Sequence, residues 1–423
     1  MATNSFKYGD KTVTFTKKTV TTTTATLSDG TVIPFVGSAS SAVTSAKVSE
    51  AYVKLKGAYV PPVTVPTPPV QIPTPPVIII PPSPGTAKEI SLSDFAQLRD
   101  VADMKFALKP GSWSGGVYIS NLKNVTIEGA GKAQLTEDGI ELSGKLSGLV
   151  LSGLNLKNIE GRQIVAVGVD KVKYTGKAGT FIDGLTLQNL ISDNCGRLFH
   201  ADGNLNNGVY DGVIKDFRLL NSALTNSPEP GDYVYLGNAI DALVQGNRFD
   251  RINTRFSNPD KPNGEHNGII FMKGNGIISD NICTNHQGNF GRIWLHSIDG
   301  LKTVQILRNF VYNSLKYSAF ELQRSVESVA RGYKPANAIV NGNIAGHLSA
   351  LKDWDGQLLD LYNTGGTLEY MGNKGFDLYG TKFPISNMIN NMSDVKITEK
   401  DNQYFATLAA ALAGIPTLKA LMA

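Results

Sequence analysis

Two short segments of the sequence each carry a carboxylate between apolar residues. They are Ala319-Phe-Glu-Leu-Gln and Leu358-Leu-Asp-Leu-Tyr, so Glu321 and Asp360 hold the same place in an alternating pattern. Side chains along a β-strand point alternately to opposite faces, which sends the leucines inward and the two acids outward. On neighbouring strands the carboxyl groups lie about 5 Å apart, the spacing of the two acids in retaining glycoside hydrolysis. Glu321 and Asp360 are therefore a candidate catalytic pair.

A second pair combines a base with a cation. Lys273 and His296 end the segments Ile269-Ile-Phe-Met-Lys and Arg292-Ile-Trp-Leu-His. A polysaccharide lyase needs a base that removes the proton beside a uronate carboxylate and a cation that neutralises this carboxylate. The two residues are therefore candidates for elimination chemistry. Other carboxylates that could serve in either reaction are Asp202, Asp232, Glu265 and Asp355.

The same alternation recurs in five further segments and predicts two outward rows. The first row is Val165, Phe199, Tyr235, Phe271, Trp294, Glu321 and Asp360, and the second is Val167, Ala201, Gly237, Lys273, His296, Gln323 and Tyr362. Flat aromatic faces suit sugar rings, and polar neighbours can bond hydroxyl groups. The candidate substrate contacts are Phe199, Tyr235, Phe271, Trp294, Gln323, Tyr362 and Arg292. The alternative is that a loop or a sister chain covers this face, and a register error of one residue would turn Phe199 and Phe271 inward.

An internal repeat must bring these segments together. An alternating run that ends in Asn recurs at steps of 26 to 34 residues, and its final residues are Asn158, Asn189, Asn221, Asn247, Asn281, Asn309, Asn343 and Asn373. The local period of two argues against helical repeats, and the uneven step argues against propeller blades. The pattern predicts an all-β fold, a parallel β-helix of about eight to ten coils in which the Asn side chains stack at one turn.

Composition limits the other function classes. Charged residues make up 18% of the chain and the net charge is +4 without a basic run, which gives no footprint for nucleic acid. No stretch approaches the length of an apolar membrane span, and the first residues lack the pattern of a secretory signal. The two cysteines, Cys195 and Cys283, are too few for a disulfide framework and are expected to be free thiols.

The chain divides into four parts by composition. Residues 1–60 are rich in Thr and Val, which predicts a small β-rich anchor of two or three strands with a hairpin turn at Asp29-Gly30. Residues 61–85 hold 11 of the 20 prolines and form an extended linker. Residues 86–400 form the β-helix domain, and residues 401–423 form a helical tail. Helices at Leu92–Leu108 and Tyr404–Leu421 are expected to cap the coil or, for the second, to pack against a neighbouring chain.

The repeat over residues 88–395 resembles the pectin-lyase-like superfamily of right-handed parallel β-helices. With its small N-terminal part, linker and C-terminal element, the chain also resembles bacteriophage tailspikes. This resemblance implies a homotrimeric virion spike that is assembled in the host cytoplasm and acts outside the cell. It implies a host surface polysaccharide as the ligand and a capsid or tail protein as the partner of residues 1–60. Whether the spike cleaves the polysaccharide stays open.

Residues Gly264–Asn309 resemble the chondroitinase B and alginate lyase family, in which a Lys base lies on one coil and an Arg-His pair on the next. Lys273 and His296 match this placement, but Leu295 precedes the histidine and Arg292 lies three residues earlier. The calcium ligands of that family have no secure match, although Glu265 is near. No metal site or cofactor is predicted, and calcium is expected only for a lyase. The alternatives are a stand-alone glycoside hydrolase or, less favoured, polysaccharide lyase, and a non-enzymatic spike or adhesin.

Overall fold

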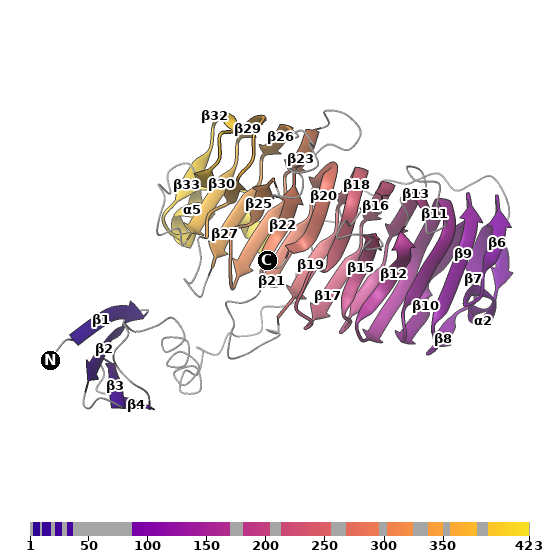
Figure 1. Cartoon of the computed structure of the whole chain (residues 1–423), viewed down its shortest axis with the longest axis horizontal. Helices are drawn as coiled ribbons and strands as arrows, with labels where there is room; N and C mark the ends of the chain where they lie inside the picture. The colour runs from indigo at the N-terminus through magenta and orange to yellow at the C-terminus, as the bar shows by residue number, and fades with distance from the viewer. Residues whose placement is uncertain are drawn as a thin grey trace. The chain divides into compact units, whose positions relative to one another are not determined.

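The computed structural model of the chain divides into two compact units (Figure 1). The first contains strands β1 to β4, and the second contains the elements from β5 to α6. The structure describes the backbone of residues 3–8, 11–17, 22–27 and 32–36, and it describes residues 87–169, 181–203, 213–254, 268–295, 303–324, 337–349, 356–378 and 388–422. The predicted linker, residues 61–85, lies outside these ranges.

The N-terminal unit contains an antiparallel meander. Its strands pair in chain order and are β1 (Thr3–Tyr8), β2 (Lys11–Lys17), β3 (Thr22–Leu27) and β4 (Val32–Val36). Strands β3 and β4 flank Asp29-Gly30 and pair with Thr24 opposite Pro34. The meander therefore has one strand more than the sequence predicted.

The second unit is a parallel β-helix built from three sheets. Sheet 1 contains β6 (Arg99–Ala102), β9 (Val117–Lys123), β11 (Ile140–Ile159), β12 (Arg162–Val169), β15 (Arg197–Gly203), β18 (Val234–Gln245), β20 (Gly268–Ser279), β22 (Asn289–Trp294), β25 (Phe320–Gln323), β28 (Leu359–Tyr362) and β31 (Ile389–Met392). Strands β11, β18 and β20 are long enough to bend into the next sheet. The predicted parallel β-helix is confirmed.

The other two sheets complete each coil. Sheet 2 contains later parts of β11, β18 and β20 with β5 (Lys88–Ile90), β7 (Lys105–Leu108), β10 (Thr126–Glu137), β13 (Phe181–Gln188), β16 (Val213–Leu220), β23 (Thr303–Leu307), β26 (Asn337–Asn341), β29 (Thr367–Met371) and β32 (Lys396–Lys400). Sheet 3 contains the ends of β10 and β11 with β8 (Gly111–Trp113), β14 (Ile191–Asp193), β17 (Ala223–Ser227), β19 (Arg248–Ile252), β21 (Ile282–His286), β24 (Phe310–Ser314), β27 (Ile344–Leu348), β30 (Lys374–Leu378) and β33 (Gln403–Phe405).

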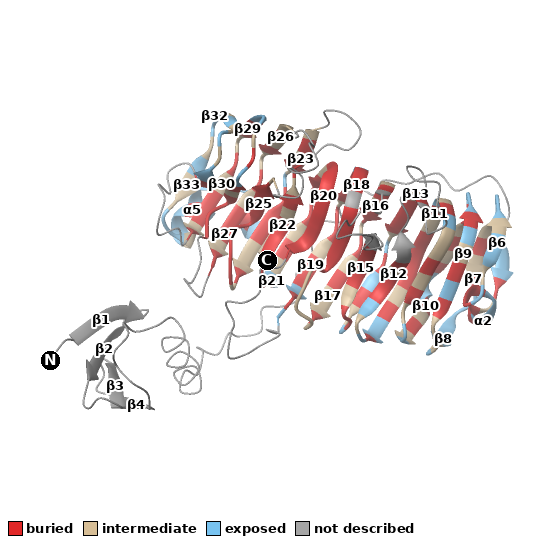
Figure 2. Ribbon diagram, viewed as in Figure 1, coloured by how far each residue is buried: buried red, intermediate tan, exposed pale blue. Residues whose placement is uncertain are grey.

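Buried residues recur on strand after strand of the coil (Figure 2), and the apolar ones form one continuous core. Ile293, Leu322 and Leu361 are paired on successive strands of sheet 1, and each is 0% exposed. Such stacking removes apolar surface from water along the whole helix, which is the main stabilising contribution of the fold. The predicted inward positions, Ile293, Leu295, Phe320, Leu322, Leu359 and Leu361, are all buried.

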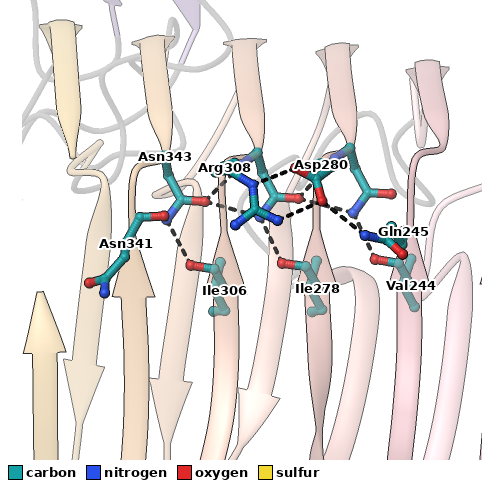
Figure 3. Close-up of polar contacts among 10 residues, drawn as sticks. Val244, Gln245, Ile278, Asp280, Ile306, Arg308, Asn341 and Asn343 are labelled. Atoms are coloured by element: carbon teal, nitrogen blue, oxygen red, sulfur yellow. Dashed lines mark hydrogen bonds and ion pairs between the residues drawn. The ribbon is translucent and has the colours of Figure 1, made fainter. Parts of the chain in front are cut away.

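A ladder of asparagines lines the turn between sheets 2 and 3 (Figure 3). The main-chain N–H and Nδ2 of Asn309 both donate to Oδ1 of Asn343, each at 3.0 Å. Nδ2 of Asn309 also donates to the carbonyl oxygen of Ile278 at 2.9 Å. The same pattern joins Asn247, Asn281, Asn309, Asn343, Asn373 and Asn402. Each buried amide is thus satisfied by its neighbours, as buried polar groups must be.

The prediction of eight equivalent asparagines is wrong for the first three. Ser222 holds the ladder position before Asn247, because its N–H donates to Asn247 Oδ1 at 2.9 Å. Asn221 therefore stands one place earlier, in the left-handed conformation with φ 49°, as does Asn189 with φ 53°. Asn158 belongs to another turn, after sheet 3, where it accepts a bond from Asn194 at 2.9 Å. Asparagine suits both positions because it tolerates left-handed geometry.

The two ends of the coil are closed differently. At the N-terminal end the predicted helix is only one turn, α2 (Leu92–Phe95), and a Ser91–Asp94 capping box starts it. The chain then forms β6 and β7. Phe95 is fully buried and covers the N-terminal end of the hydrophobic core. At the C-terminal end the tail forms α5 (Leu408–Gly414) and α6 (Leu418–Met422), which pack against the outer face of sheet 3 through Phe310 and Phe376. No helix among the described residues could cross a membrane.

Candidate functional site

The outer face of sheet 1 gathers charged and aromatic residues from successive strands. Strand pairing defines a first row of His200, Tyr235, Phe271, Arg292, Glu321 and Asp360, from β15, β18, β20, β22, β25 and β28. A second row, two residues further along the strands, is Lys273, Trp294, Gln323 and Tyr362. Because parallel strands lie about 4.8 Å apart, each row runs along the axis of the β-helix.

Three predicted row members, Phe199, Ala201 and Trp294, occupy other places. Phe199 is 0% exposed and stacks inside the coil on Phe217, with ring centroids 4.7 Å apart. Its neighbour His200 takes the outward position, because β15 is shifted by one residue from the predicted register and a shift of one exchanges the two faces. Arg292 replaces Trp294 in the first row, and Trp294 moves to the second. That shift is of two residues, so both side chains stay outward.

The predicted carboxylate pair is brought together. Glu321 on β25 is paired directly with Asp360 on β28, so the two residues lie on adjacent coils. On the other side of Glu321, Nε of Arg292 donates to Oε1 at 3.2 Å. The side chains of Arg292 and Glu321 are only 18% and 7% exposed. An arginine that is both paired and poorly solvated neutralises the charge of Glu321 and orients its carboxylate.

Lys273 lies among aromatic rings. Its Nζ is 4.4 Å from the ring centroid of Trp294, 5.7 Å from that of Tyr235 and 5.8 Å from that of Phe271. Cation–π contacts of this kind contribute about 0.5–2 kcal/mol each, the larger values where water is excluded, and Lys273 is 6% exposed. The predicted partner His296 lies outside the described residues, so the Lys273–His296 pair is not tested.

Most of the aromatic face is packed rather than open. Tyr235 is 8% exposed and Phe271 is 6% exposed, and their ring centroids lie 5.4 Å apart. His200 stacks on Tyr235 at 4.7 Å, and Trp294 meets Phe271 edge-on at 5.3 Å. Tyr362 differs, because it is 47% exposed at the C-terminal end of the second row. Among the predicted aromatic contacts, Tyr362 has the surface that a sugar ring can stack on.

Two buried donors on this face lack hydrogen-bond partners within the described part of the chain. They are Nε1 of Trp294 and Nε2 of Gln323, which belong to paired residues on β22 and β25. A buried donor without an acceptor costs about 1–3 kcal/mol. A fold that retains two such donors side by side provides places for the oxygen atoms of a ligand.

The remaining sequence candidates are divided. Asp232 is described and lies at the start of β18, while Glu265 and Asp355 fall outside the described residues and nothing is described of the Asp202 side chain. Among the described residues, no three metal-binding side chains gather as a site. His200 is not among the predicted site residues, although a shift of one residue in Arg197-Leu-Phe-His-Ala places it in the first row.

Comparisons with known proteins give a distant likeness among solved structures. No protein-family model matches the chain, and a search of curated proteins finds no match either. Among solved structures, a chain described as a mannuronic acid specific polysaccharide family 6 lyase enzyme from human gut microbiota shares 10% identity. The likeness covers 75% of this chain and 87% of that chain, with a TM-score of 0.27. A likeness of this degree carries no argument about what the present chain binds or does.

Proposed function

We propose that the chain binds a polysaccharide along the outer face of sheet 1. The observation that supports the proposal is a group of poorly exposed ionisable side chains on three successive coils, Lys273, Arg292 and Glu321, set among aromatic rings. Charged groups that lose their hydration contribute little net stability even when they are paired, and clusters of them are typical of binding and catalytic sites. The rows run along the axis, which suits a ligand that is itself a long chain.

The same face has the chemistry for glycan recognition. Tyr362 supplies an open ring for the apolar face of a sugar, and Trp294 and Gln323 supply donors for hydroxyl or carboxylate oxygens. Lys273 and Arg292 add positive charge. The combination of aromatic surface with convergent polar groups is that of a ligand site.

We further propose that the chain cleaves the bound polysaccharide by hydrolysis. Glu321 and Asp360 are the adjacent carboxylates, and a glycoside hydrolase needs one carboxyl group to donate a proton and another to attack or to activate water. The contact of Glu321 with Arg292 favours the ionised role for Glu321.

A lyase is the second candidate, and one observation favours it. Lys273 and Arg292 lie on adjacent coils of the same face, so a basic nitrogen and a cation are both present without His296. Elimination would take the proton beside a uronate carboxylate and leave an unsaturated product. Ultraviolet absorbance of that product separates the two reactions.

The proposed setting is a virion spike that recognises a host surface polysaccharide, as a homotrimer that residues 1–60 attach to a capsid or tail protein. The supporting observation is the separate N-terminal unit, which is distinct from the β-helix that carries the candidate site. Sedimentation of the full chain tests the trimer. Binding of the full chain to purified capsid or tail protein, and loss of this binding when residues 1–60 are removed, test the spike, because a stand-alone enzyme does not need such a partner.

Incubation of the full chain with a panel of purified bacterial surface polysaccharides tests the function. Product mass, new reducing ends and unsaturated uronate absorbance are measured for the native chain, for Glu321→Gln and for Glu128→Gln, an exposed acid on sheet 2. Hydrolysis predicts products that Glu321→Gln abolishes and Glu128→Gln leaves. Binding without products indicates an adhesin, and absence of binding to every glycan contradicts the proposal.

A further inference from the structure

Asp232 lies where the chain enters β18 and reaches the next coil. Its Oδ1 accepts a hydrogen bond from the main-chain N–H of Gly268, at the start of β20, at 2.9 Å. Gly268 in turn lies against Arg292, because a Cβ atom added at Gly268 would come within 2.8 Å of the Arg292 Cβ. The Asp232 carboxyl group is thus held beside the coil that precedes Arg292.

The segment before Asp232 is shaped by an arginine. Nη2 of Arg197 donates to the carbonyl oxygen of Pro230 at 2.9 Å. Gly231 has φ 125°, and a Cβ atom there would lie 2.6 Å from the Arg197 guanidinium. Only glycine fits this close approach in that conformation. The turn therefore depends on Gly231, and it sets Asp232 at the border of sheet 1.

Three charged or titratable groups surround Asp232. They are Arg292, Arg197 and His200, in decreasing order of their effect on the carboxyl group, and each lowers its pKa. Burial has the largest effect and raises the pKa of Asp232 above its ordinary value, so burial outweighs the three neighbours. A carboxyl group that holds its proton more strongly than usual while it borders a ligand site is suited to donate that proton.

We propose that Asp232 is the proton donor of the glycan site and acts with Glu321 across Arg292. This inference rests on the proposed function. The Asp232 carboxyl is held at the first residue of β20 and Glu321 stands on β25. Strand β22 with Arg292 lies between them, so these two acids are farther apart than Glu321 and Asp360, which lie on adjacent strands. Carboxyl groups about 6.5–9.5 Å apart leave room for water and suit inversion, whereas the adjacent Glu321–Asp360 pair suits retention.

The reaction balances without a further reagent. The Asp232 carboxyl group gives its proton to the glycosidic oxygen as the bond from C1 to this oxygen breaks, and the bonding electrons stay with the leaving oxygen. A water oxygen bonds to C1 from the opposite face while the Glu321 carboxylate takes a proton from that water. One water molecule is consumed, and each product carries a new hydroxyl group.

The stereochemistry of the product tests this assignment. Proton NMR of the first-formed reducing end is recorded during cleavage by the full chain of whichever glycan the panel identifies. Inversion at C1 is expected. Retention overturns the role of Asp232 and favours Asp360, while the proposed hydrolysis stands. An unsaturated uronate product, or no cleavage of any glycan, overturns the inference together with the proposed hydrolysis.

Two variants separate a proton donor from a structural residue. Asp232→Asn keeps an oxygen for the Gly268 N–H, and Asp183→Asn on sheet 2 is the matched control. Asp232→Asn is expected to cleave the natural glycan about 100- to 10,000-fold more slowly and to lose the alkaline limb of the pH profile. A glycoside of the same sugar with a dinitrophenyl leaving group needs no acid, so its cleavage should be largely retained. Equal losses on both substrates would show that Asp232 only supports the fold.

Discussion

Asn309 and Asn343 share two hydrogen bonds across one coil, because both the N–H and Nδ2 of Asn309 donate to Oδ1 of Asn343. Oδ1 of Asn309 in turn accepts from the N–H and Nδ2 of Asn281. The ladder is therefore a chain of bonds that all run in one direction, and removal of one member affects the coils on both sides. Such a network is worth more than its separate pairs.

Asn309→Ala should lower the free energy of unfolding by about 3–5 kcal/mol. It leaves the main-chain N–H of Asn281 and one of the two Nδ2 hydrogens of Asn281 without an acceptor, and it removes the bond to the carbonyl oxygen of Ile278. The control is Asn313→Gly, at the turn after sheet 3, where Asn313 has φ 61°. This substitution should lower the free energy of unfolding by less than about 1 kcal/mol. Denaturant unfolding followed by circular dichroism measures both. Equal effects of the two substitutions would contradict a stabilising ladder.

His286 should make the protein sensitive to mild acid. It is 0% exposed, and burial lowers its pKa from 6.5 to about 4, while a contact with the Gly288 backbone offsets only part of this shift. Above pH 6.5 the histidine is neutral in both states and the folded state has its full stability. As the pH falls from 6.5 to 4, the unfolded chain takes up a proton that the folded chain refuses, and about 3 kcal/mol is lost.

His286→Leu removes this titrating group and tests whether His286 causes the predicted loss of stability at acid pH. Unfolding free energies of the native chain and the variant are measured between pH 4 and pH 7.5. The native value minus the variant value should fall by about 3 kcal/mol toward acid, because the native chain loses stability faster. The comparison needs only the difference between the two curves, because the other titrating groups are shared. Parallel curves would mean that His286 does not titrate in this range.

Arg292 and Glu321 should be energetically coupled. Their contact at 3.2 Å is poorly exposed, so loss of either partner leaves a charge with little solvation. Arg292→Met and Glu321→Gln, alone and together, form a double-mutant cycle. We expect a coupling energy of about 1–3 kcal/mol from thermal or denaturant unfolding. A value near zero would place the stability of this face in other contacts, and glycan cleavage should still be lost in all three variants.

Tyr362 should contribute to glycan affinity without contributing to the fold. It is 47% exposed, so Tyr362→Ala should leave the melting temperature nearly unchanged. Loss of one ring stacked on a sugar is expected to weaken binding about tenfold, which corresponds to about 1.4 kcal/mol. Calorimetry with the glycan identified by the panel measures this. Ile191, which is 50% exposed on β14 of sheet 3 and so lies away from the proposed site, is the control as Ile191→Ala.

The C-terminal tail should detach when its buried contact is lost. Leu418 of α6 is 0% exposed, and it packs with Phe310 and Phe376 of sheet 3. Leu418→Glu should therefore expose the amides of α5 and α6 to hydrogen exchange while the core strands stay protected. Leu412→Glu, at a position that is 41% exposed, serves as the control and should leave exchange unchanged. Uniform loss of protection would mean that the tail and the coil unfold as one unit.

The sequence predicted the coil and its inward rows because both depend on the period of apolar residues. Leu322 and Leu361 alternate with polar residues whatever the alignment of their strands. Their inward orientation can therefore be predicted without knowledge of the register. The outward rows depend on register between coils of unequal length, which the period does not define. A shift of one residue turned Phe199 inward, and a shift of two moved Trp294 to the second row.

The asparagines show a different limit. Asn221 and Asn247 end similar runs, yet one adopts the left-handed turn position and the other forms the ladder. Both positions favour asparagine for independent reasons, so residue type alone does not distinguish them. The sequence also could not predict that the tail packs on sheet 3, because amphipathic spacing predicts a helix but does not identify the surface that the helix contacts. The role proposed for Asp232 depends on Gly268 and Arg292, which are distant from it in the chain.

The path of the tail changes how the coil can come apart. In a solenoid each turn contacts only its neighbours, so a terminal turn can fray while the interior stays intact. Here α5 and α6 leave the last turn at Phe405 and rest on side chains from several earlier turns, among them Ile282 and Phe310. The final turns are thereby tied to ones well inside the stack. Unfolding from this end must first detach α5 and α6. We therefore expect the C-terminal third of the β-helix to unfold as one cooperative unit.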